Sequence, residues 1–380
     1  MFKVVFVSNF FNHHQKPFSD LLYEKLNGNY SFIESSDIDE ERINLGWSLS
    51  DYPDYVFRYL KSPEKCREII NKADVVIYGN APEFLVDEHL RKGKLAFRYS
   101  ERIYKNGYNC LKLPVRIIKN YKKYGKYKNL YLLCAGAYVY NDYAKTFNFK
   151  NKAYKWGYFP ELIKYENISQ FIDKKVNNSI LWCGRLIDWK HPDYAINLAI
   201  NLKNCGYDFR LTIVGTGPME EQIKLLIKQN SLDDYVCLTG SMPPEEVRKY
   251  MEQSQIFLFT SDKKEGWGAV LNEAMNSACG VVAGKAPGSV PFLVQDGYNG
   301  LIYNPKDDND LFVKVKYLLD NKSELKAMSE RAYCTVYDLW NADSASDRFI
   351  ELTENILNGN LSPNLFSDGP CSKAVLVDEL

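Results

Sequence analysis

Short apolar runs alternate with stretches of helical periodicity along most of the chain. In the first half, runs rich in Val, Ile, Leu, Phe and Tyr predict strands at KVVFVSNF (3–10), ADVVIYGN (73–80), KLAFRYS (94–100) and LYLLCAG (130–136). In the second half, similar runs predict strands at SILWCGRL (179–186), FRLTIVGTG (209–217), DYVCLTG (234–240), IFLFTSD (256–262) and CGVVAGK (279–285). Between these later runs, helical spacing of apolar residues predicts helices at PDYAINLAINLKNCG (192–206), PMEEQIKLLIKQN (218–230) and PEEVRKYMEQS (244–254).

These strands are of the kind that is buried on both faces. When such strands alternate with helices, they form parallel sheets built from βαβ units. Two sets, separated near 167–179, predict an α/β chain with two Rossmann-like domains whose parallel sheets face each other across a cleft. We expect domains at 1–165 and 166–338, a last helix within 339–358, and a tail at 359–380. Because the tail is rich in Gly, Ser, Pro and Asn, we expect it to be loosely ordered.

The composition is that of a soluble globular protein. The chain has 380 residues, 46% hydrophobic and 25% charged, with a formal net charge of zero, so no global field draws it to nucleic acid or to a membrane. Its nine cysteines are scattered without a CxxC pair, which favours reduced thiols in a reducing cytosol. The sequence shows neither a signal peptide nor the roughly 20 apolar residues of a membrane span. We therefore expect a cytoplasmic protein.

The segment SDKKEGWGAVLNEAM (261–275) combines carboxylates with glycines at a predicted strand-to-helix junction. Glu265 and Glu273 are eight residues apart, which would be roughly 12 Å along a helix axis. A sugar and a ribose joined through a diphosphate are spaced on that scale, so each carboxylate can accept hydrogen bonds from one of them. A helix that begins near Gly268 would offer unpaired N–H groups to the diphosphate between them. Gly266 and Gly268 allow the backbone to approach closely.

Cations for a diphosphate are present in LWCGRLIDWKHPD (181–193). Arg185 follows a buried strand and a glycine, and Lys190 lies five residues further on. A guanidinium can bind phosphate oxygens as a fork while an ammonium adds a point charge, so the pair can stabilise a diphosphate leaving group without a metal. Either residue alone would be read as a solvated surface charge, but the combination in this order favours a binding site.

The second half resembles family 4 glycosyltransferases, which are retaining enzymes with the GT-B fold. The resemblance covers most of 178–305 and rests on CGRLIDWKHPD, LTIVGTGPMEEQI, VCLTGSMPPEEVRKYMEQSQIFLFTS, the E-x7-E pair in EGWGAVLNEAM, and QDGYNGLIY. It implies that Arg185 and Lys190 bind the diphosphate, that Glu265 meets the donor sugar and that Glu273 holds the ribose. The other donor-site residues that it implies are Gly184, Gly215, Gly217, Gly240, Ser241, Met242, Gly266, Trp267 and Gly268.

Two residues depart from the family's pattern. Trp267 stands where Phe is usual, and we expect the larger ring to reshape the sugar pocket. Phe292 stands where the family often has a glutamate outside the donor pair. Both departures bear on specificity rather than on activity.

The first half is the expected acceptor domain, and its site is less explicit. His13 and His14 follow the first strand, where ligands gather in such folds. They either contact the acceptor or are solvated loop residues. Glu101, just past the strand at 94–100, either takes the place of a family histidine that faces the reacting centre or forms a cap or ion pair with Arg102. No histidine or carboxylate has metal-ligand spacing, so no metal site is expected.

A basic segment follows Glu101. Nine Lys or Arg residues occur between 102 and 128, and no acidic residue occurs from 102 to 141. A basic amphipathic segment can lie on an anionic membrane surface, so residues 116–130 are candidates for contact with the inner leaflet of the plasma membrane. The alternative is a solvated helix face. Nucleic-acid binding is not expected because no RNA-binding motif accompanies the charge.

The sequence thus predicts a retaining hexosyltransferase-type enzyme that uses a nucleotide-diphosphate sugar. The resemblance favours a UDP-sugar donor, a glycan or lipid-linked acceptor, and a role in bacterial surface polysaccharide synthesis. It also implies that the N-terminal domain binds the acceptor, that the C-terminal domain binds the nucleotide sugar, and that the last helix crosses back to the N-terminal domain. The alternatives are a GT-B sugar-nucleotide epimerase and a non-catalytic partner subunit of a transferase.

Overall fold

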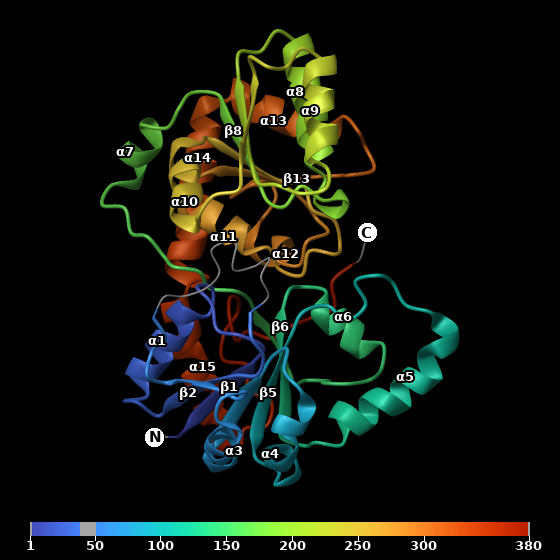
Figure 1. The fold of residues 1–380 in the computed structure, drawn as a ribbon, viewed down its shortest axis with the longest axis vertical. Helices are drawn as coiled ribbons and strands as arrows, with labels where there is room; N and C mark the ends of the chain where they lie inside the picture. Colours follow the sequence, from blue (N-terminus) through green and yellow to red (C-terminus); the bar gives the residue numbers. More distant parts are fainter. Residues whose placement is uncertain (1, 39–50, 379–380) are drawn as a thin grey trace. The chain divides into compact units, whose positions relative to one another are not determined.

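The computed structural model describes residues 2–38 and 51–378. The chain divides into unit 1, which comprises Met1–Glu161 and Trp340–Glu379, and unit 2, which comprises Leu162–Leu339. Figure 1 shows a parallel sheet with flanking helices in each unit. The predicted limits after residues 165 and 338 fall close to those of the structure. Among the described residues, no helix is both long enough and apolar enough to cross a membrane.

Unit 1 is built on a seven-stranded parallel sheet in the order β3-β2-β1-β4-β5-β6-β7. Its strands are β1 (Val4–Ser8), β2 (Tyr30–Glu34), β3 (Val56–Arg58), β4 (Val75–Tyr78), β5 (Leu95–Ser100), β6 (Leu130–Ala135) and β7 (Ala153–Trp156). Its helices are α1 (Lys16–Lys25), α3 (Pro63–Lys72), η1 (Glu83–Leu85), α4 (Asp87–Arg91), η2 (Cys110–Lys112), α5 (Leu113–Asn120), η3 (Tyr121–Gly125), α6 (Val139–Ala144) and α15 (Ala342–Leu357). All residues of β1, β4 and β6 are buried, as expected for central strands that are covered on both faces.

Unit 2 has a six-stranded parallel sheet in the order β10-β9-β8-β11-β12-β13. Its strands are β8 (Ser179–Cys183), β9 (Arg210–Val214), β10 (Val236–Gly240), β11 (Ile256–Phe259), β12 (Gly280–Gly284) and β13 (Leu301–Tyr303). Its helices are α7 (Ile168–Asp173), η4 (Asp188–Lys190), α8 (Pro192–Asn204), α9 (Glu220–Gln229), α10 (Pro244–Gln253), α11 (Ala269–Asn276), α12 (Val290–Leu293), α13 (Asp310–Asp320), α14 (Lys322–Cys334) and η5 (Thr335–Leu339). Every strand that the sequence predicted is present, and β2, β3, β7 and β13 are additional.

Helix α15 belongs to unit 1, where it packs against α1. Its first turn is capped by the Asn341 side chain, which accepts a hydrogen bond from the Ser344 N–H at 2.8 Å. Lys25 of α1 pairs with Asp343 and Asp347 of α15, each at 2.6 Å. Residues that follow unit 2 in the sequence therefore complete unit 1.

The expectation of a loosely ordered tail is wrong. The segment 359–378 lies against β7, where the N–H of Lys155 donates to the Ser372 carbonyl at 2.8 Å and the N–H of Ala374 donates to the Ala153 carbonyl at 3.0 Å. Lys373 forms an antiparallel bridge with Tyr154. These bonds give the tail the partners that its composition did not indicate, and they cover the edge of the sheet.

Candidate active site

The predicted donor residues gather at the carboxyl edge of the unit 2 sheet. The strand order reverses between β8 and β11, which are hydrogen-bonded neighbours, and ligands of open α/β sheets bind at such a switch point. Gly184 and Arg185 directly follow β8, and Glu265 follows β11. Gly215 follows β9, and Gly240 ends β10. Four neighbouring strands therefore end in predicted donor-site residues.

An ion pair joins the two predicted catalytic segments. The Lys190 Nζ lies 2.5 Å from the Glu265 Oε2, and their side chains are only 14% and 13% exposed. The Ser261 hydroxyl donates to the same carboxylate oxygen at 3.2 Å. The positive charge expected at the diphosphate and the carboxylate expected at the sugar are thus adjacent, although 75 residues separate them. Arg185 is an exposed residue on the loop between β8 and η4.

Buried polar groups fix the position of this ion pair. The Thr260 hydroxyl accepts a hydrogen bond from the Trp182 indole at 2.8 Å and donates to the Lys190 carbonyl at 2.6 Å. The Asp262 N–H donates to the Trp189 carbonyl at 2.8 Å. The loop after β11 is therefore fastened to the segment that carries Lys190, so the ammonium and the carboxylate meet without a long, flexible reach.

Glycines are required where these loops approach one another. Gly215 has a φ of +138°, and a Cβ built there would lie 1.9 Å from the Gly184 carbonyl oxygen. Gly268, with a φ of +83°, is the N-cap of α11, and a Cβ there would lie 2.4 Å from the Phe259 ring. A larger residue at either position must displace the backbone or a buried ring. Gly217 and Gly266 lie in the same two loops.

Glu273 lies within α11, but Glu265 precedes the helix, which begins at Ala269. The residues between them therefore do not form one helix, and the helical rise of roughly 12 Å does not describe the separation of the two carboxylates. Burial raises the pKa of the Glu273 carboxyl, and the nearby Arg248 guanidinium opposes this shift. Arg248 also donates to the Glu273 carbonyl at 3.2 Å and to the Asn276 side chain at 3.0 Å. The carboxyl is thus held where its ionised form is poorly solvated.

The variant Glu273→Gln is expected to unfold less readily than the wild type above neutral pH. Because burial raises the folded-state pKa of this carboxyl, its contribution to stability is present at low pH and is lost as pH rises through the folded pKa. A glutamine at this position does not ionise, so the variant does not lose stability in this way. Urea unfolding at pH 5 and pH 8 measures the free energy of unfolding, and the variant's advantage over the wild type should be larger at pH 8.

Glu246→Gln, at a half-exposed side chain of α10, is the matched control and should show no such pH-dependent gain. Equal stability of wild type and Glu273→Gln at both pH values would contradict the assignment of a poorly solvated carboxylate. Nucleotide-sugar affinity should nevertheless fall by about 10- to 100-fold in Glu273→Gln if the carboxylate accepts ribose hydroxyls, since charged hydrogen bonds contribute roughly 1.5–3 kcal/mol.

Trp267 is fully buried. Its indole donates to the Asn272 side chain at 2.8 Å, and its carbonyl accepts a hydrogen bond from the Ser289 hydroxyl at 2.6 Å. The ring centroid lies 6.3 Å from that of Phe292. The two departures from the family's pattern are therefore neighbours, and the indole ring acts on the turn by packing beneath it rather than by lining an open pocket.

The remaining donor-site predictions fall at β10. Ser241 and Met242 directly follow this strand and precede α10. The Gly240 carbonyl accepts a hydrogen bond from the Gly215 N–H at 2.8 Å, which brings the β10 end beside the glycine loop after β9.

A second polar cluster lies at the carboxyl edge of the unit 1 sheet. The Tyr158 hydroxyl, just after β7, donates to the Glu101 carboxylate at 2.7 Å, and Lys105 pairs with the other oxygen of that carboxylate at 2.5 Å. The His14 ring stacks toward Tyr158 with centroids 6.3 Å apart, and the His13 ring is 3.9 Å from that of His14. The structure thus brings together the three residues that the sequence singled out in this half.

Burial and the neighbouring His13 lower the pKa of His14 well below its ordinary value, so its ring is neutral at pH 7. Arg102, the ion-pair partner considered for Glu101, pairs with Asp142 at 3.0 Å. The sequence reasoning missed Tyr158. Its position directly after an edge strand of the same sheet is the signal that could have found it.

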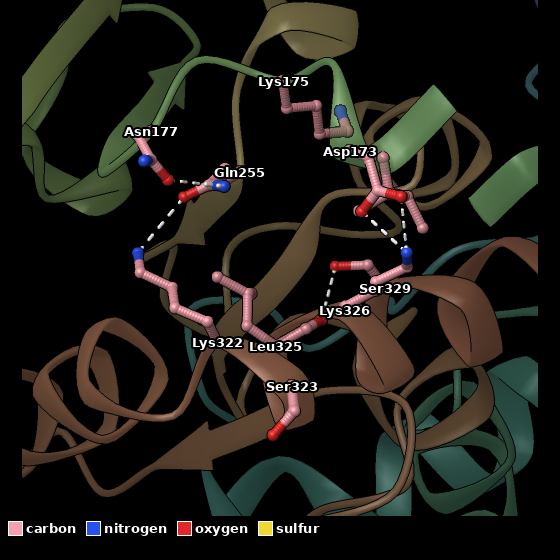
Figure 2. A pocket seen from close by; sticks show the side chains of 10 residues that line it. Asp173, Lys175, Asn177, Gln255, Lys322, Ser323, Leu325, Lys326 and Ser329 are labelled. Atoms are coloured by element: carbon pink, nitrogen blue, oxygen red, sulfur yellow. Dashed lines mark hydrogen bonds and ion pairs between the residues drawn. The ribbon is translucent and has the colours of Figure 1, made fainter. Parts of the chain in front are cut away.

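Figure 2 shows a pocket of about 450 Å³ in unit 2. Two of its lining residues, Asn177 and Gln255, precede β8 and β11 in the sequence, so the pocket lies beside the amino ends of these strands. It is lined by Ile172, Asp173, Lys175, Asn177, Gln255, Lys322, Ser323, Leu325, Lys326 and Ser329. Lys326 pairs with Asp173 at 2.6 Å, and Lys175 donates to the carbonyls of Met251, Glu252 and Ser254. These ammonium groups form ion pairs and hydrogen bonds within unit 2, and none of the predicted donor residues lines the pocket.

The predicted donor residues at the carboxyl edge of the unit 2 sheet lie in a segment whose sequence matches a known protein family. Residues 164–335 match the family model described as glycosyl transferases group 1. This part of the chain is similar to the glycosyl transferases of group 1. The matched range contains Arg185, Lys190, Glu265 and Glu273, which are the charged residues of the donor-site prediction.

The curated proteins that this part of the chain resembles include named glycosyltransferases. The amylovoran biosynthesis glycosyltransferase AmsK of Erwinia amylovora is 29% identical over 182 residues, which are 47% of this chain and 44% of AmsK. The N-acetylgalactosamine-N,N'-diacetylbacillosaminyl-diphospho-undecaprenol 4-alpha-N-acetylgalactosaminyltransferase of Campylobacter jejuni is 30% identical over 45% of this chain and 46% of that enzyme. The chain thus spans about half the length of the curated relatives it matches.

Similarity to solved structures extends over both units. The structure of HepE from Anabaena in complex with UDP and glucose has a TM-score of 0.65 and 14% identity, and the match covers 93% of this chain and 100% of HepE. At this identity the likeness concerns the fold. The GT-B fold that the resemblance implied is confirmed.

Proposed function

We propose that the protein is a retaining glycosyltransferase that moves a sugar, favoured to be a hexose carried by UDP, onto a glycan or lipid-linked acceptor in bacterial surface polysaccharide synthesis. The observation that carries the proposal is the half-buried Lys190–Glu265 pair at the switch point of the sheet in the segment that matches group 1 glycosyl transferases. A charge pair of this kind offers one group to phosphate and one to sugar hydroxyls.

The proposed roles follow from the chemistry of each group. Arg185 and Lys190 neutralise the diphosphate as the glycosidic bond breaks, which stabilises the leaving group without a metal ion. Glu265 accepts hydrogen bonds from the transferred sugar, and Glu273 accepts them from the ribose. The departing phosphate oxygen takes the acceptor proton on the same face of the sugar, so no protein nucleophile is needed and the configuration is retained.

The acceptor is proposed to meet the Glu101 cluster of unit 1. Glu101, His13 and His14 present a carboxylate and imidazoles near the ends of parallel strands, and such groups can bind sugar hydroxyls. The printed function of the Campylobacter jejuni relative, transfer onto a diphospho-undecaprenol-linked sugar, supports a lipid-linked acceptor. The name of AmsK supports polysaccharide synthesis, and UDP bound to HepE supports a uridine donor. A lipid-linked acceptor would place the enzyme at the inner face of the plasma membrane.

The test is incubation of the protein with a panel of nucleotide sugars, with and without mixed lipid-linked and soluble glycan acceptors. Release of UDP that depends on acceptor is expected, and the anomeric configuration of the product, determined by NMR, should match that of the donor. Interconversion of the donor sugar without acceptor would indicate an epimerase instead. Binding of nucleotide sugars without turnover for any acceptor would indicate a non-catalytic subunit.

A further inference from the structure

The helical segment 110–125 of unit 1 has two apolar faces. It runs without a break through η2, α5 and η3, at one side of the unit (Figure 1). Tyr124 is buried, while Leu113 and Ile117 are half-buried, and the Tyr124 ring packs against those of Tyr143 and Phe149 at 5.4 and 5.7 Å. Asn120 donates a hydrogen bond to Thr146 and Lys123 pairs with Glu83, so the segment is attached to unit 1 along this side.

The second apolar face points to solvent. Leu111, Val115 and Ile118 are 91%, 70% and 59% exposed, and their spacing of four and three residues places them in one stripe along the helix. Tyr121, 61% exposed, continues it. A helix that only covers its own domain would carry polar residues here, so this stripe needs another explanation.

Basic residues border the stripe, and the segment itself carries no acidic residue, although Glu83 of η1 pairs with Lys123. Lys112, Lys119, Lys122 and Lys126 are exposed, and the sequence from 102 to 141 contains no Asp or Glu, in a chain of zero net charge. In helical projection, Lys122 lies in line with the stripe, and the other three lie along one side of it. The arrangement joins an apolar stripe to a border of exposed lysines.

We propose that residues 111–126 bind the surface of an anionic lipid bilayer, with Leu111, Val115 and Ile118 inserted among the acyl chains near the headgroups and the lysines on the lipid phosphates. Interfacial helices combine these two features. A protein partner would have to be acidic and flat along the whole helix, whereas a bilayer presents both chemistries everywhere. The biological meaning of this docking rests on the proposed function, but the binding itself does not.

The test is sedimentation of the full chain with vesicles of phosphatidylcholine alone or with 30% phosphatidylglycerol. Binding is expected only to the anionic vesicles and should weaken with salt. Ile118→Glu should reduce binding at least 10-fold. Replacing Lys119, Lys122 and Lys126 together by glutamine should reduce it by about 100-fold, since each basic residue near such a surface contributes roughly a five-fold factor.

Matched controls lie on unit 2. Leu225→Glu changes a leucine that is 55% exposed on α9, and Lys224, Lys228 and Lys249, which are also exposed, are replaced together by glutamine. Both controls should bind vesicles as the wild type does, and circular dichroism checks the folding of every variant. Equal losses in controls and test variants, or no binding by the wild type, would overturn the inference.

Two further measurements distinguish membrane docking from nucleic-acid binding and from the proposed sugar transfer. If single-stranded RNA bound the protein and Ile118→Glu weakened that binding as much as it weakens vesicle binding, the partner would be a nucleic acid. The new glutamate would then act through its charge and not by removing an apolar contact. Sugar transfer to a soluble acceptor should survive Ile118→Glu. Loss of vesicle binding with transfer retained supports membrane docking, whereas a wild type that transfers sugar but never binds vesicles rejects docking and leaves the proposed function intact.

Discussion

Replacing Lys190 by alanine is expected to lower kcat/KM for sugar transfer by about 10²- to 10³-fold, the scale seen when one preorganised group that stabilises transition-state charge is removed. The loss has two sources. The diphosphate leaving group loses an ammonium, and Glu265, whose side chain is 13% exposed, keeps its negative charge without its partner. The second effect repels the donor, so both kcat and nucleotide-sugar affinity should fall. Initial rates of acceptor-dependent UDP release measure the change.

Two companion variants define the result. Lys190→Arg keeps the charge and should recover part of the lost rate, whereas Lys264→Ala removes a 38% exposed lysine from the neighbouring loop and should change kcat/KM by less than about threefold. Unfolding in urea checks that Lys190→Ala is folded. A folded Lys190→Ala enzyme with nearly wild-type kcat/KM would show that the ion pair is structural and that the donor site is elsewhere.

Gly215→Ala is expected to cost about 3 kcal/mol of folding stability and to abolish measurable donor binding. At a φ of +138°, the new methyl group would lie 1.9 Å from the Gly184 carbonyl oxygen. The clash is with backbone, which no rotamer change can relieve, and a side chain in this φ region adds roughly 1–2 kcal/mol. Relief requires separation of the loops after β8 and β9, which would move Gly184 and Arg185 away from the diphosphate. Urea unfolding and donor binding by calorimetry measure both effects.

Gly206→Ala isolates the contribution of the clash. Gly206 also has a positive φ, of +75°, but its Cβ would meet nothing within 4 Å. This variant should lose only about 1 kcal/mol and should bind the donor normally. If Gly215→Ala behaved in the same way, the close approach of the two loops would be unimportant for donor binding.

The sequence predicted the parts of the molecule that local pattern determines. Long buried strands such as β1 and β6 carry unmistakable apolar runs, and the helix near Gly268 follows from a glycine turn before an apolar periodic stretch. No local signal specifies that two loops whose residues are 75 positions apart will follow neighbouring strands of the sheet. The sequence therefore could not show that the Lys190 ammonium pairs directly with Glu265. It also applied a helical rise across the turn before α11, although the helix begins only at Ala269.

Composition was misleading where distant partners decide the structure. The tail from residue 359 is rich in Gly, Ser, Pro and Asn, yet backbone hydrogen bonds to Lys155 and Ala153 hold it in place. Tyr158 has no motif of its own and gains importance only through contact with Glu101 and His14. Likewise, the sequence did not show which apolar residues of the segment 110–125 are exposed. The structure shows that Tyr124 is buried and that the stripe faces solvent.

The position of α15 and the tail has a consequence for the synthesis of the protein. Unit 1 contains residues from both sides of unit 2, so residues 340–378 leave the ribosome only after all of unit 2. Domains usually fold in the order in which they are synthesised. In this protein, however, the sheet of unit 1 is synthesised first but lacks two parts until the end: the tail that covers β7 and the helix α15 that packs on α1. Unit 2, which is continuous in sequence, can therefore finish folding first. Until residues 340–378 are synthesised, the edge at β7 and the surface of α1 stay exposed.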